Sequence, residues 1–566
     1  MEGGISRRMK AQEEEYVPEK ELHSEKRKMR MEDSWSPKKF KGADLKDDRN
    51  ENLSERSLIL NRQILRFTLI PRLIAAFLWV LVIAFVTYEV YLAAEEHLEW
   101  QKDPVMNPGP FTQLIGRGRD TTDFEWAVFT EMFFGKLIFW YTVYVVISAV
   151  LQVYFPQALP KVSTVVTFYF LKSLLGTSPT IYLFSMPVVY WLVKRLRSRT
   201  AIWVVSFAYL YLIENSWHKI IISVAPGKSE YYFAISSAWN AARCISFCFD
   251  TWDRSDSASV SSLVVFIQYC FYFPLTINGP LILFDKYEKH IILQSSIPKT
   301  IDKLRTDIIS LIFKLGKILI WIIIIEIILH FLYFRPLALT IPALYEINWW
   351  ALCGVVYWLG QFFQLKYVVM YGIPSAIVEF EGLPAPPSPK CIAYVHRYSV
   401  LWKDFDRGLY YFLVRYTYLP TLEFFTNIDR QHKINPEFRK LCASLATFIY
   451  VYIWHSSSFE VFVWAFFNFL GITIERIGSF LKRKIDAKYN ILPSLWDVCF
   501  EPIFTIPLAI MSVINSAVFC GTLPTAYTVL IRFLSEFQIH YVPYFMVLFT
   551  NVGVLVRTWP ILRKEE

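Results

Sequence analysis

The sequence predicts an all-α polytopic membrane protein, and its composition and the length of its apolar runs together lead to that prediction. Of its 566 residues, 54% are hydrophobic and 17% aromatic, and the mean hydropathy of +0.34 is too high for a soluble globular chain. Apolar runs of about 20 residues, the length that a helix needs to cross a bilayer, recur along most of the chain. We therefore expect a bundle of roughly ten to twelve transmembrane and re-entrant helices, surrounded by the lipid bilayer.

Charge and cysteine content argue against a nucleic-acid-binding surface and against a zinc site or a disulfide framework. The formal net charge is +9, and the basic residues collect in short runs beside apolar segments, where they act as topology signals. We therefore expect no nucleic-acid partner. The eight cysteines show no paired metal-ligand spacing, so the sequence indicates neither a zinc site nor a disulfide framework.

The chain begins with a polar segment that differs from the rest. Residues 1–58 are rich in Lys, Glu and Met without apolar periodicity, so we expect a disordered charged arm followed by a membrane domain over residues 59–566. The arm also lacks the apolar core of a secretory signal. Arginines precede the first apolar run, at about residues 73–92, which places the arm in the cytosol by the positive-inside rule.

Glycine and proline interrupt two of the apolar runs that follow. In residues 163–193, Gly176 and two prolines predict two shorter helices rather than one long one. In residues 270–284, the segment Pro274-Leu-Thr-Ile-Asn278-Gly279-Pro280 has to release backbone groups from helical hydrogen bonds at membrane depth. Such a break is tolerated where it is buried in protein or lines a cavity, and a plain kinked helix is the alternative.

A less apolar region then separates two sets of spans. Residues 382–397 form a proline-stiffened loop that contains Cys391, and residues 402–420 form an amphipathic segment with two carboxylates and two arginines. We expect the amphipathic segment to lie at the membrane interface or against the bundle.

His455 lies within a strongly apolar stretch, residues 448–475. An imidazole at membrane depth exchanges water for the partners that the bundle supplies, so an ionisable group in this position indicates a functional site. A core histidine bonded to a backbone carbonyl of a neighbouring helix is the alternative.

Taken together, these features resemble the membrane-bound O-acyltransferase (MBOAT) family. The resemblance rests on Trp454-His455 in an apolar helix, on Phe405-Asp406 ahead of Arg415, and on the interrupted run at residues 274–280. Shorter matches, such as residues 122–126 and 366–367, continue in order along the chain. Two departures stand out: Ser456 and Ser457 replace two glycines that usually follow the histidine, and Ile277 replaces a histidine before Asn-Gly-Pro.

The resemblance implies an MBOAT-type bundle and a reaction. It is closest to the branch that transfers palmitate from palmitoyl-CoA to the N-terminal cysteine amine of secreted Hedgehog or Hedgehog-related signalling proteins. It therefore implies palmitoyl-CoA as the acyl donor and a secreted protein with an N-terminal cysteine as the partner. The implied location is the endoplasmic reticulum membrane, as a multi-pass protein, with the Golgi as the alternative.

The resemblance also implies roles for individual residues. His455 is the expected general base, and we expect its buried imidazole to be neutral, as that role requires. Asp406 is the second catalytic residue, for which we favour an organising role, such as holding Arg415 and the interfacial helix. Cys391 aligns with a cysteine that ligates haem iron through its sulfur, so haem is the implied cofactor, with an inert loop cysteine as the alternative. The expected substrate tunnel comprises Pro274, Asn278, Gly279, Pro280, Arg415 and Asn468.

Other functions stay open at this point. The presence of His455 and Asp406 argues against a non-catalytic MBOAT-like regulator, whereas Ser456 and Ser457 leave it possible. An O-acyltransferase that modifies a serine hydroxyl of a secreted protein is a further alternative. A transporter would also have interrupted helices with polar groups near the midplane, but no inverted repeat is visible in the sequence.

Overall fold

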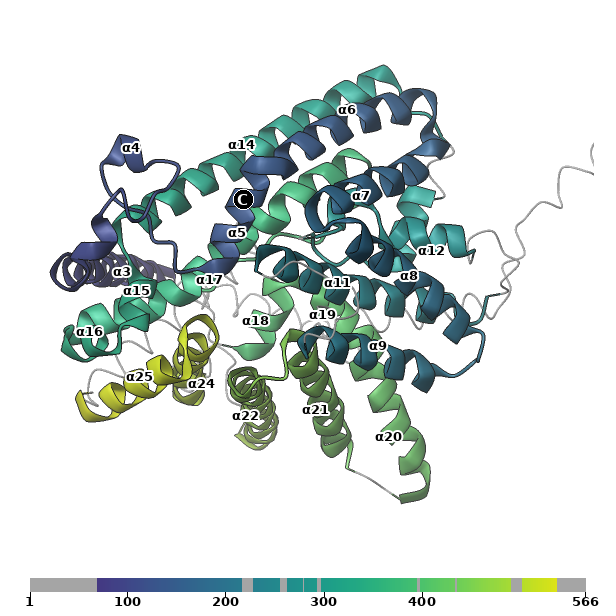
Figure 1. Cartoon of the computed structure of the whole chain (residues 1–566). Helices are drawn as coiled ribbons and strands as arrows, with labels where there is room; N and C mark the ends of the chain where they lie inside the picture. Colours follow the sequence, from purple (N-terminus) through teal and green to yellow (C-terminus); the bar gives the residue numbers. More distant parts are fainter. Residues whose placement is uncertain are drawn as a thin grey trace, which may run out of the picture. The chain divides into compact units, whose positions relative to one another are not determined.

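A computed structural model gives the fold of the helical part of the chain (Figure 1). All described residues belong to the unit Phe67–Glu566. The predicted arm at residues 1–58 lies outside the described residues. The structure describes residues 69–215, 227–254, 262–277, 279–292, 297–393, 397–432, 435–489 and 501–536.

Within these ranges every regular element is a helix, as the sequence predicts. The elements are α3 (Leu69–His97), η1 (Glu99–Lys102), α4 (Thr112–Ile115), α5 (Phe124–Met132), η2 (Phe133–Leu137), α6 (Ile138–Tyr154), η3 (Pro156–Ala158), α7 (Leu159–Leu175), α8 (Thr177–Lys194), α9 (Arg199–Glu214), α11 (Lys228–Asp250), α12 (Leu263–Cys270), η5 (Phe273–Leu275), α13 (Phe284–Tyr287), η6 (Glu288–Ile292), α14 (Ile301–Phe331), α15 (Phe334–Leu339), α16 (Ile341–Glu346), α17 (Trp349–Phe380), α18 (Tyr398–Phe405), α19 (Arg407–Leu413), η8 (Val414–Tyr418), α20 (Leu419–His432), α21 (Pro436–His455), α22 (Phe459–Tyr489), α24 (Glu501–Ser516), η10 (Ala517–Gly521) and α25 (Leu523–Glu536).

Four helical segments in the described part of the chain are long and apolar enough to cross a membrane. Their mean hydropathies range from 1.4 to 2.5, and they carry many apolar side chains on their outer faces, as lipid contact requires. Together with the helical architecture, they confirm the all-α polytopic membrane class. The segments are Leu73–His97, Phe124–Tyr154, Ile301–Phe331 and Phe459–Ile485.

The long helix α17 organises the bundle. It packs against α3, α14 and α15, and Figure 1 shows it running through the middle of the helices. At its N-terminus the Asn348 side chain accepts a hydrogen bond from the backbone N–H of Ala351. Gly354 lets α3 approach closely, because a Cβ there would lie 2.4 Å from the backbone oxygen of Val86. The helix continues through Pro374 to Phe380.

Both expected interruptions are present. Helices α7 and α8 meet at Gly176, whose φ of 92° is accessible to glycine and rarely to other residues. Helix α12 ends at Cys270, and the described residues between it and Phe284, where α13 begins, form only the short turn η5. This segment, residues 271–283, is called the interhelical break below. The alternative of a plain kinked helix is therefore wrong.

Side chains from neighbouring helices satisfy the backbone of the interhelical break. Arg243 of α11 is buried and donates to the carbonyl oxygens of Cys270 (3.3 Å) and Leu275. This replaces the bonds that a continuous helix would have made, which a membrane interior requires. Further bonds run from Thr167 Oγ1 to Phe271 O (2.8 Å), from Tyr141 OH to Pro274 O (3.3 Å), from Tyr269 OH to Ile282 O (2.7 Å) and from Phe273 N to Ser163 Oγ (2.9 Å).

Candidate functional site

A cavity of about 1260 Å³ lies between the helices that surround α17. Its walls are largely aromatic and aliphatic, which suits an apolar ligand. His455, Asp406 and Asn468, three of the residues singled out in the sequence, all line it. The structure therefore brings together side chains that are up to 62 positions apart, from Asp406 to Asn468, on three different elements.

His455 presents an open imidazole to this cavity. It is the last residue of α21, its side chain is exposed, and that exposed surface lines the cavity. The ring lies edge-on to the rings of Trp464 and Phe519, with centroid distances of 5.1 and 5.6 Å. Neither ring nitrogen takes part in a hydrogen bond with any of the described residues, so the alternative of a histidine bonded to a neighbouring carbonyl does not describe this side chain.

The turn after His455 is held by side chains. Ser456 has a φ of 166°, an extended conformation that any residue adopts, so the usual glycines are not needed there. The Ser457 carbonyl accepts from the Tyr452 hydroxyl at 2.7 Å, and its N–H donates to the carboxylate of Glu214 on α9. These bonds fix the position of the α21 terminus, and with it the histidine.

Asp406 is the N-cap of α19. Its Oδ1 accepts from the backbone N–H of Leu409 at 2.9 Å, and its Oδ2 accepts from the Tyr371 hydroxyl at 2.9 Å. Helix α19 rests on the interhelical break, because a Cβ on Gly408 would lie 2.3 Å from the backbone oxygen of Leu281. Asp406 therefore joins α17 to α19, and its organising role stays a prediction.

Arg415 has different partners from those expected. Its guanidinium forms ion pairs with Asp250 (2.7 Å) and Asp285 (2.8 Å). Our suggestion that Asp406 holds Arg415 is therefore wrong, because two other carboxylates already engage the guanidinium and Asp406 is bonded elsewhere. The ion pairs join η8 to the C-terminus of α11 and to α13.

The other predicted tunnel residues divide into two groups. Asn468 lines the cavity, where its Oδ1 accepts from Trp402 Nε1 at 2.9 Å and its Nδ2 donates to the Trp464 carbonyl at 2.8 Å. Pro274, Gly279, Pro280 and Arg415 are not among the residues that line this cavity, and the three in the interhelical break are buried. Asn278 lies outside the described residues. A tunnel role for these five stays a prediction.

A charged cluster that the sequence did not assign to the site borders the same cavity. The Glu125 carboxylate accepts from the hydroxyls of Tyr231 (3.1 Å) and Tyr367 (3.0 Å) and pairs with the buried Lys366 at 2.7 Å. Lys366 also pairs with Asp123 at 3.0 Å. Burial acts to raise the pKa of Asp123, but the charges of Lys366 and Arg335 hold it below its usual value.

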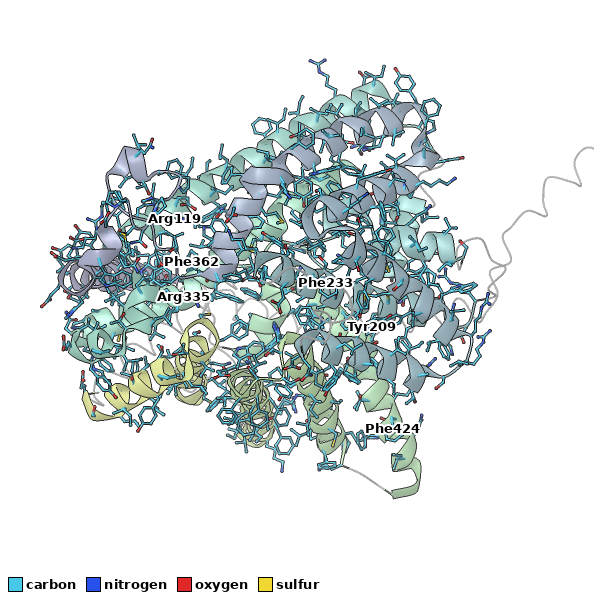
Figure 2. The ribbon with its side chains drawn as sticks, in the orientation of Figure 1. Arg119, Tyr209, Phe233, Arg335, Phe362 and Phe424 are labelled. Carbon is cyan, nitrogen blue, oxygen red and sulfur yellow. The ribbon has the colours of Figure 1, made fainter. Side chains whose placement is uncertain are left out.

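Lys366 and Tyr367 lie more than 200 residues from Asp123 and Glu125 along the chain, and Tyr231 lies 106 residues from Glu125, which is why spacing alone could not connect them. Arg335, labelled in Figure 2, extends the cluster with an ion pair to Asp123 at 2.9 Å. One sequence feature could have indicated this cluster: Lys366 lies within an otherwise apolar helix, and a charge in such a position is almost always paired.

Cys391 has an exposed thiol in the loop after α17. Its sulfur lies 3.9 Å from Gln361 Oε1, and the next two residues, Ile392 and Ala393, line the cavity. No group of three or more His, Cys, Asp or Glu side chains in the described ranges is arranged to hold a metal ion. Haem iron can take a single axial thiolate from the protein, and Cys391 is an accessible thiol, so haem at this position stays a prediction.

Comparison with known proteins gives one family and several relatives. The family described as MBOAT, membrane-bound O-acyltransferase, matches residues 140–511, which include His455, Asp406 and Cys391. The protein-cysteine N-palmitoyltransferase HHAT of Mus musculus is 26% identical over 407 residues, covering 69% of this chain and 77% of the relative.

Two further relatives have similar names. The protein-cysteine N-palmitoyltransferase Rasp of Drosophila melanogaster is 26% identical over 311 residues, or 54% of this chain and 57% of Rasp. The protein-cysteine N-palmitoyltransferase HHAT-like protein of Mus musculus is 24% identical over 378 residues, or 65% of this chain and 70% of the relative.

Proposed function

This chain belongs to the membrane-bound O-acyltransferase family, and from that premise we propose that it transfers palmitate from palmitoyl-CoA to the N-terminal cysteine amine of a secreted Hedgehog or Hedgehog-related signalling protein. That it is a multi-pass membrane acyltransferase follows from the family and the apolar helices. The names of its relatives support the choice of palmitate and of cysteine. The observation that carries the proposal is the open imidazole of His455 on the cavity wall.

The chemistry of amide formation explains why an open imidazole matters. An α-amino group has a pKa of about 8, so it is largely protonated at neutral pH and has to lose a proton to become a nucleophile. As the amine nitrogen attacks the thioester carbonyl, the C–N bond forms and the C–S bond breaks. His455 takes the proton from the nitrogen and returns it to the CoA thiolate, so that thiol and amide are the products.

The cavity suits this pair of substrates. At about 1260 Å³ it exceeds the roughly 300–1,000 Å³ typical of small-molecule sites, which leaves room for a long acyl chain together with a peptide terminus. The aromatic rings around His455 keep water away from the thioester, which would otherwise be hydrolysed. Asp406 acts through position, because it starts α19 and fixes one wall of the cavity.

The proposal includes a location. We place the enzyme in the endoplasmic reticulum membrane, with the Golgi as the alternative, where the donor arrives from the cytosol and the secreted acceptor from the lumen. Glycosylation tags in the arm and in the loop near residues 98–123 check this orientation. Glycosylation of the loop alone is expected, and glycosylation of the arm alone would show the opposite orientation of the chain in the membrane.

Haem is part of the proposal as a cofactor held by the Cys391 thiolate. Its role is structural, joining the loop after α17 to the bundle, and none of the transfer chemistry depends on it. The purified protein is expected to show a Soret band that disappears in Cys391→Ala while the thermal unfolding profile still shows a folded protein. A Soret band that survives the substitution, or a colourless wild-type protein, would remove haem from the account.

A transfer assay with purified protein tests the reaction. Palmitoyl-CoA is supplied with a peptide that begins with cysteine, with the same peptide acetylated at its N-terminus, and with an N-acetylated peptide that contains serine. Only the first peptide is expected to accept palmitate stably, because only it offers an amine. Transfer to the serine peptide would identify a serine O-acyltransferase, and no transfer to any peptide by a folded protein would favour a non-catalytic regulator.

A further inference from the structure

Four carboxylates border the cavity, and three of them are fully engaged by the protein itself. The four residues are Glu125, Glu214, Asp406 and Glu536. Glu125 pairs with Lys366 at 2.7 Å, and Glu536 accepts two bonds from the Arg532 guanidinium, at 2.6 and 2.7 Å. Asp406 accepts one hydrogen bond on each of its oxygens, at 2.9 Å. The fold therefore already uses the carboxylates of Glu125, Asp406 and Glu536.

Glu214, the last residue of α9, differs from the other three. Its Oε1 accepts from the backbone N–H of Ser457, whereas its Oε2 forms no hydrogen bond or ion pair with any residue that the structure describes. The side chain is exposed and lines the cavity. No lysine or arginine is among the described residues of the cavity lining. Glu214 therefore offers a negative charge and one unbonded oxygen to a ligand.

The carboxylate of Glu214 borders the same part of the cavity as the imidazole of His455. Ser457, whose N–H it accepts, follows His455 by two positions, and two residues of chain span at most about 7 Å. Both Glu214 and His455 line the cavity. The carboxylate is therefore placed to contact a group that reacts at the imidazole.

The direction of α9 indicates from which side that group arrives. Residues 194–199, which lead into α9, contain four lysines and arginines, so the positive-inside rule places the N-terminus of this helix in the cytosol. Glu214, at the other end of α9, then lies toward the lumen. A secreted acceptor enters from that side, whereas the phosphates of the donor have the same sign of charge as Glu214 and are repelled by it.

We propose that Glu214 binds the α-ammonium group of the acceptor and so selects proteins with a free N-terminus. The inference rests on the proposed acyl transfer and names the residue that recognises the acceptor. An α-amino group has a pKa of about 8, so most acceptor molecules arrive with a positive charge at neutral pH. A carboxylate without a cationic partner attracts that charge.

Recognition of the ammonium is compatible with the role of His455. The imidazole takes one proton from the bound ammonium, which leaves a neutral amine to attack the thioester. The positive charge moves from the acceptor to the imidazolium and stays beside the carboxylate of Glu214, so that charge is balanced before and after the proton transfer. The imidazolium then gives the proton to the CoA thiolate. Glu214 contacts the substrate and exchanges no proton.

Glu214→Gln tests the charge and keeps the turn. The amide oxygen of the new side chain still accepts from the Ser457 N–H, whereas the negative charge is lost. The measurement is binding of a cysteine-initiated peptide, labelled at its C-terminus, by fluorescence anisotropy, with the N-acetylated peptide as the reference. At pH 7 the wild type is expected to bind the free amine about fivefold more tightly, and Glu214→Gln is expected to bind both peptides alike.

The pH dependence separates recognition of a charge from a change in shape. As the pH rises through the pKa of the α-amino group, near 8, the ammonium becomes neutral, so the wild-type preference is expected to fall toward onefold. Glu214→Gln is expected to show no such dependence. In the transfer assay at pH 7, the same variant should raise KM for the peptide about fivefold and change kcat less.

A matched variant removes the same charge elsewhere. Glu131 is exposed and lies outside the cavity lining, so Glu131→Gln is expected to keep the wild-type preference for the free amine. Equal preferences in wild type and Glu214→Gln would overturn the inference. An equal loss in Glu131→Gln would also overturn it, because net charge and not contact would then be responsible.

Two features keep this test separate from that of the proposed function. Binding is measured without transfer, so a protein that prefers the free amine through Glu214 but transfers no palmitate would contradict the proposed function alone. The pH series also needs no variant. A wild-type preference that stays constant from pH 6 to pH 9 would refute ammonium recognition, even if Glu214→Gln failed to fold.

Discussion

The interhelical break at residues 271–283 and the cavity wall around His455 are both places where polar groups sit inside a membrane bundle, yet they are treated in opposite ways. In the interhelical break, Arg243 and several hydroxyls bond to the freed backbone. On the cavity wall, neither ring nitrogen of His455 forms a hydrogen bond with any residue that the structure describes. The hydrogen bonds of the interhelical break stabilise the fold, whereas the cavity wall around His455 is left open for a ligand.

The two regions also meet. Gly408 in α19 touches the backbone of Leu281, so the interhelical break is the platform for the helix that Asp406 starts. The interhelical break, whose backbone groups are hydrogen-bonded, therefore supports the wall of the open cavity. Changes in the first region are expected to lower stability, whereas changes in the second are expected to lower turnover in a protein that still folds.

The largest expected effect is on catalysis. His455→Ala should lower the rate of palmitoyl transfer about 100-fold or more, because no other side chain would take the proton, while the unfolding temperature stays close to wild type. Transfer rates from purified protein and thermal unfolding in detergent measure the two quantities.

A second histidine gives a matched control. His330 is fully buried, and its Nδ1 lies 2.6 Å from the Glu326 carbonyl oxygen. His330→Ala is expected to lower the unfolding temperature and to leave the turnover of the folded fraction unchanged. Near wild-type transfer by His455→Ala would refute the role of base.

The next effect concerns stability. Arg243→Met would leave the carbonyls of Cys270 and Leu275 without donors, which we expect to cost about 2–4 kcal/mol in the free energy of unfolding. Denaturation of the purified protein by SDS measures the change. The matched control is Arg305→Met, at an exposed position of α14, where little change is expected. Equal stability of the two variants would contradict the role assigned to Arg243.

The smallest effect tests how Asp406 is held. Tyr371→Phe removes one of the two hydrogen bonds to its carboxylate and is expected to lower kcat about fivefold, with KM for either substrate nearly unchanged. Because Tyr371 acts through Asp406, adding Tyr371→Phe to Asp406→Asn should cost nothing further. Additive losses in the double variant would show that the tyrosine works independently of Asp406.

Local sequence patterns predicted the features of the fold that depend on neighbouring residues. The helical class, the interruptions at Gly176 and after Cys270, and the position of His455 in an apolar helix follow from hydropathy, glycine and proline. Helix α17 continues through Pro374, although a proline usually ends or kinks a helix. The resemblance marked Asp406, but not its bond to Tyr371.

The sequence alone could not identify ion-pair partners that lie far apart along the chain. The buried pair of Lys366 with Glu125, and the contacts of Arg415 with Asp250 and Asp285, join positions that are 130 residues or more apart. Charge and burial show that such groups need partners, but only the folded chain shows which ones.

The acidic lining of the cavity bears on which molecules compete with the donor. Free palmitate has the chain that fits the apolar walls, but its carboxylate would enter a space that already contains four carboxylates and no described lysine or arginine. We therefore expect free palmitate to inhibit the proposed transfer only weakly. Uncharged lipids, and lipids with an amine at the reacting end, are the chemical classes from which effective competitive inhibitors are expected.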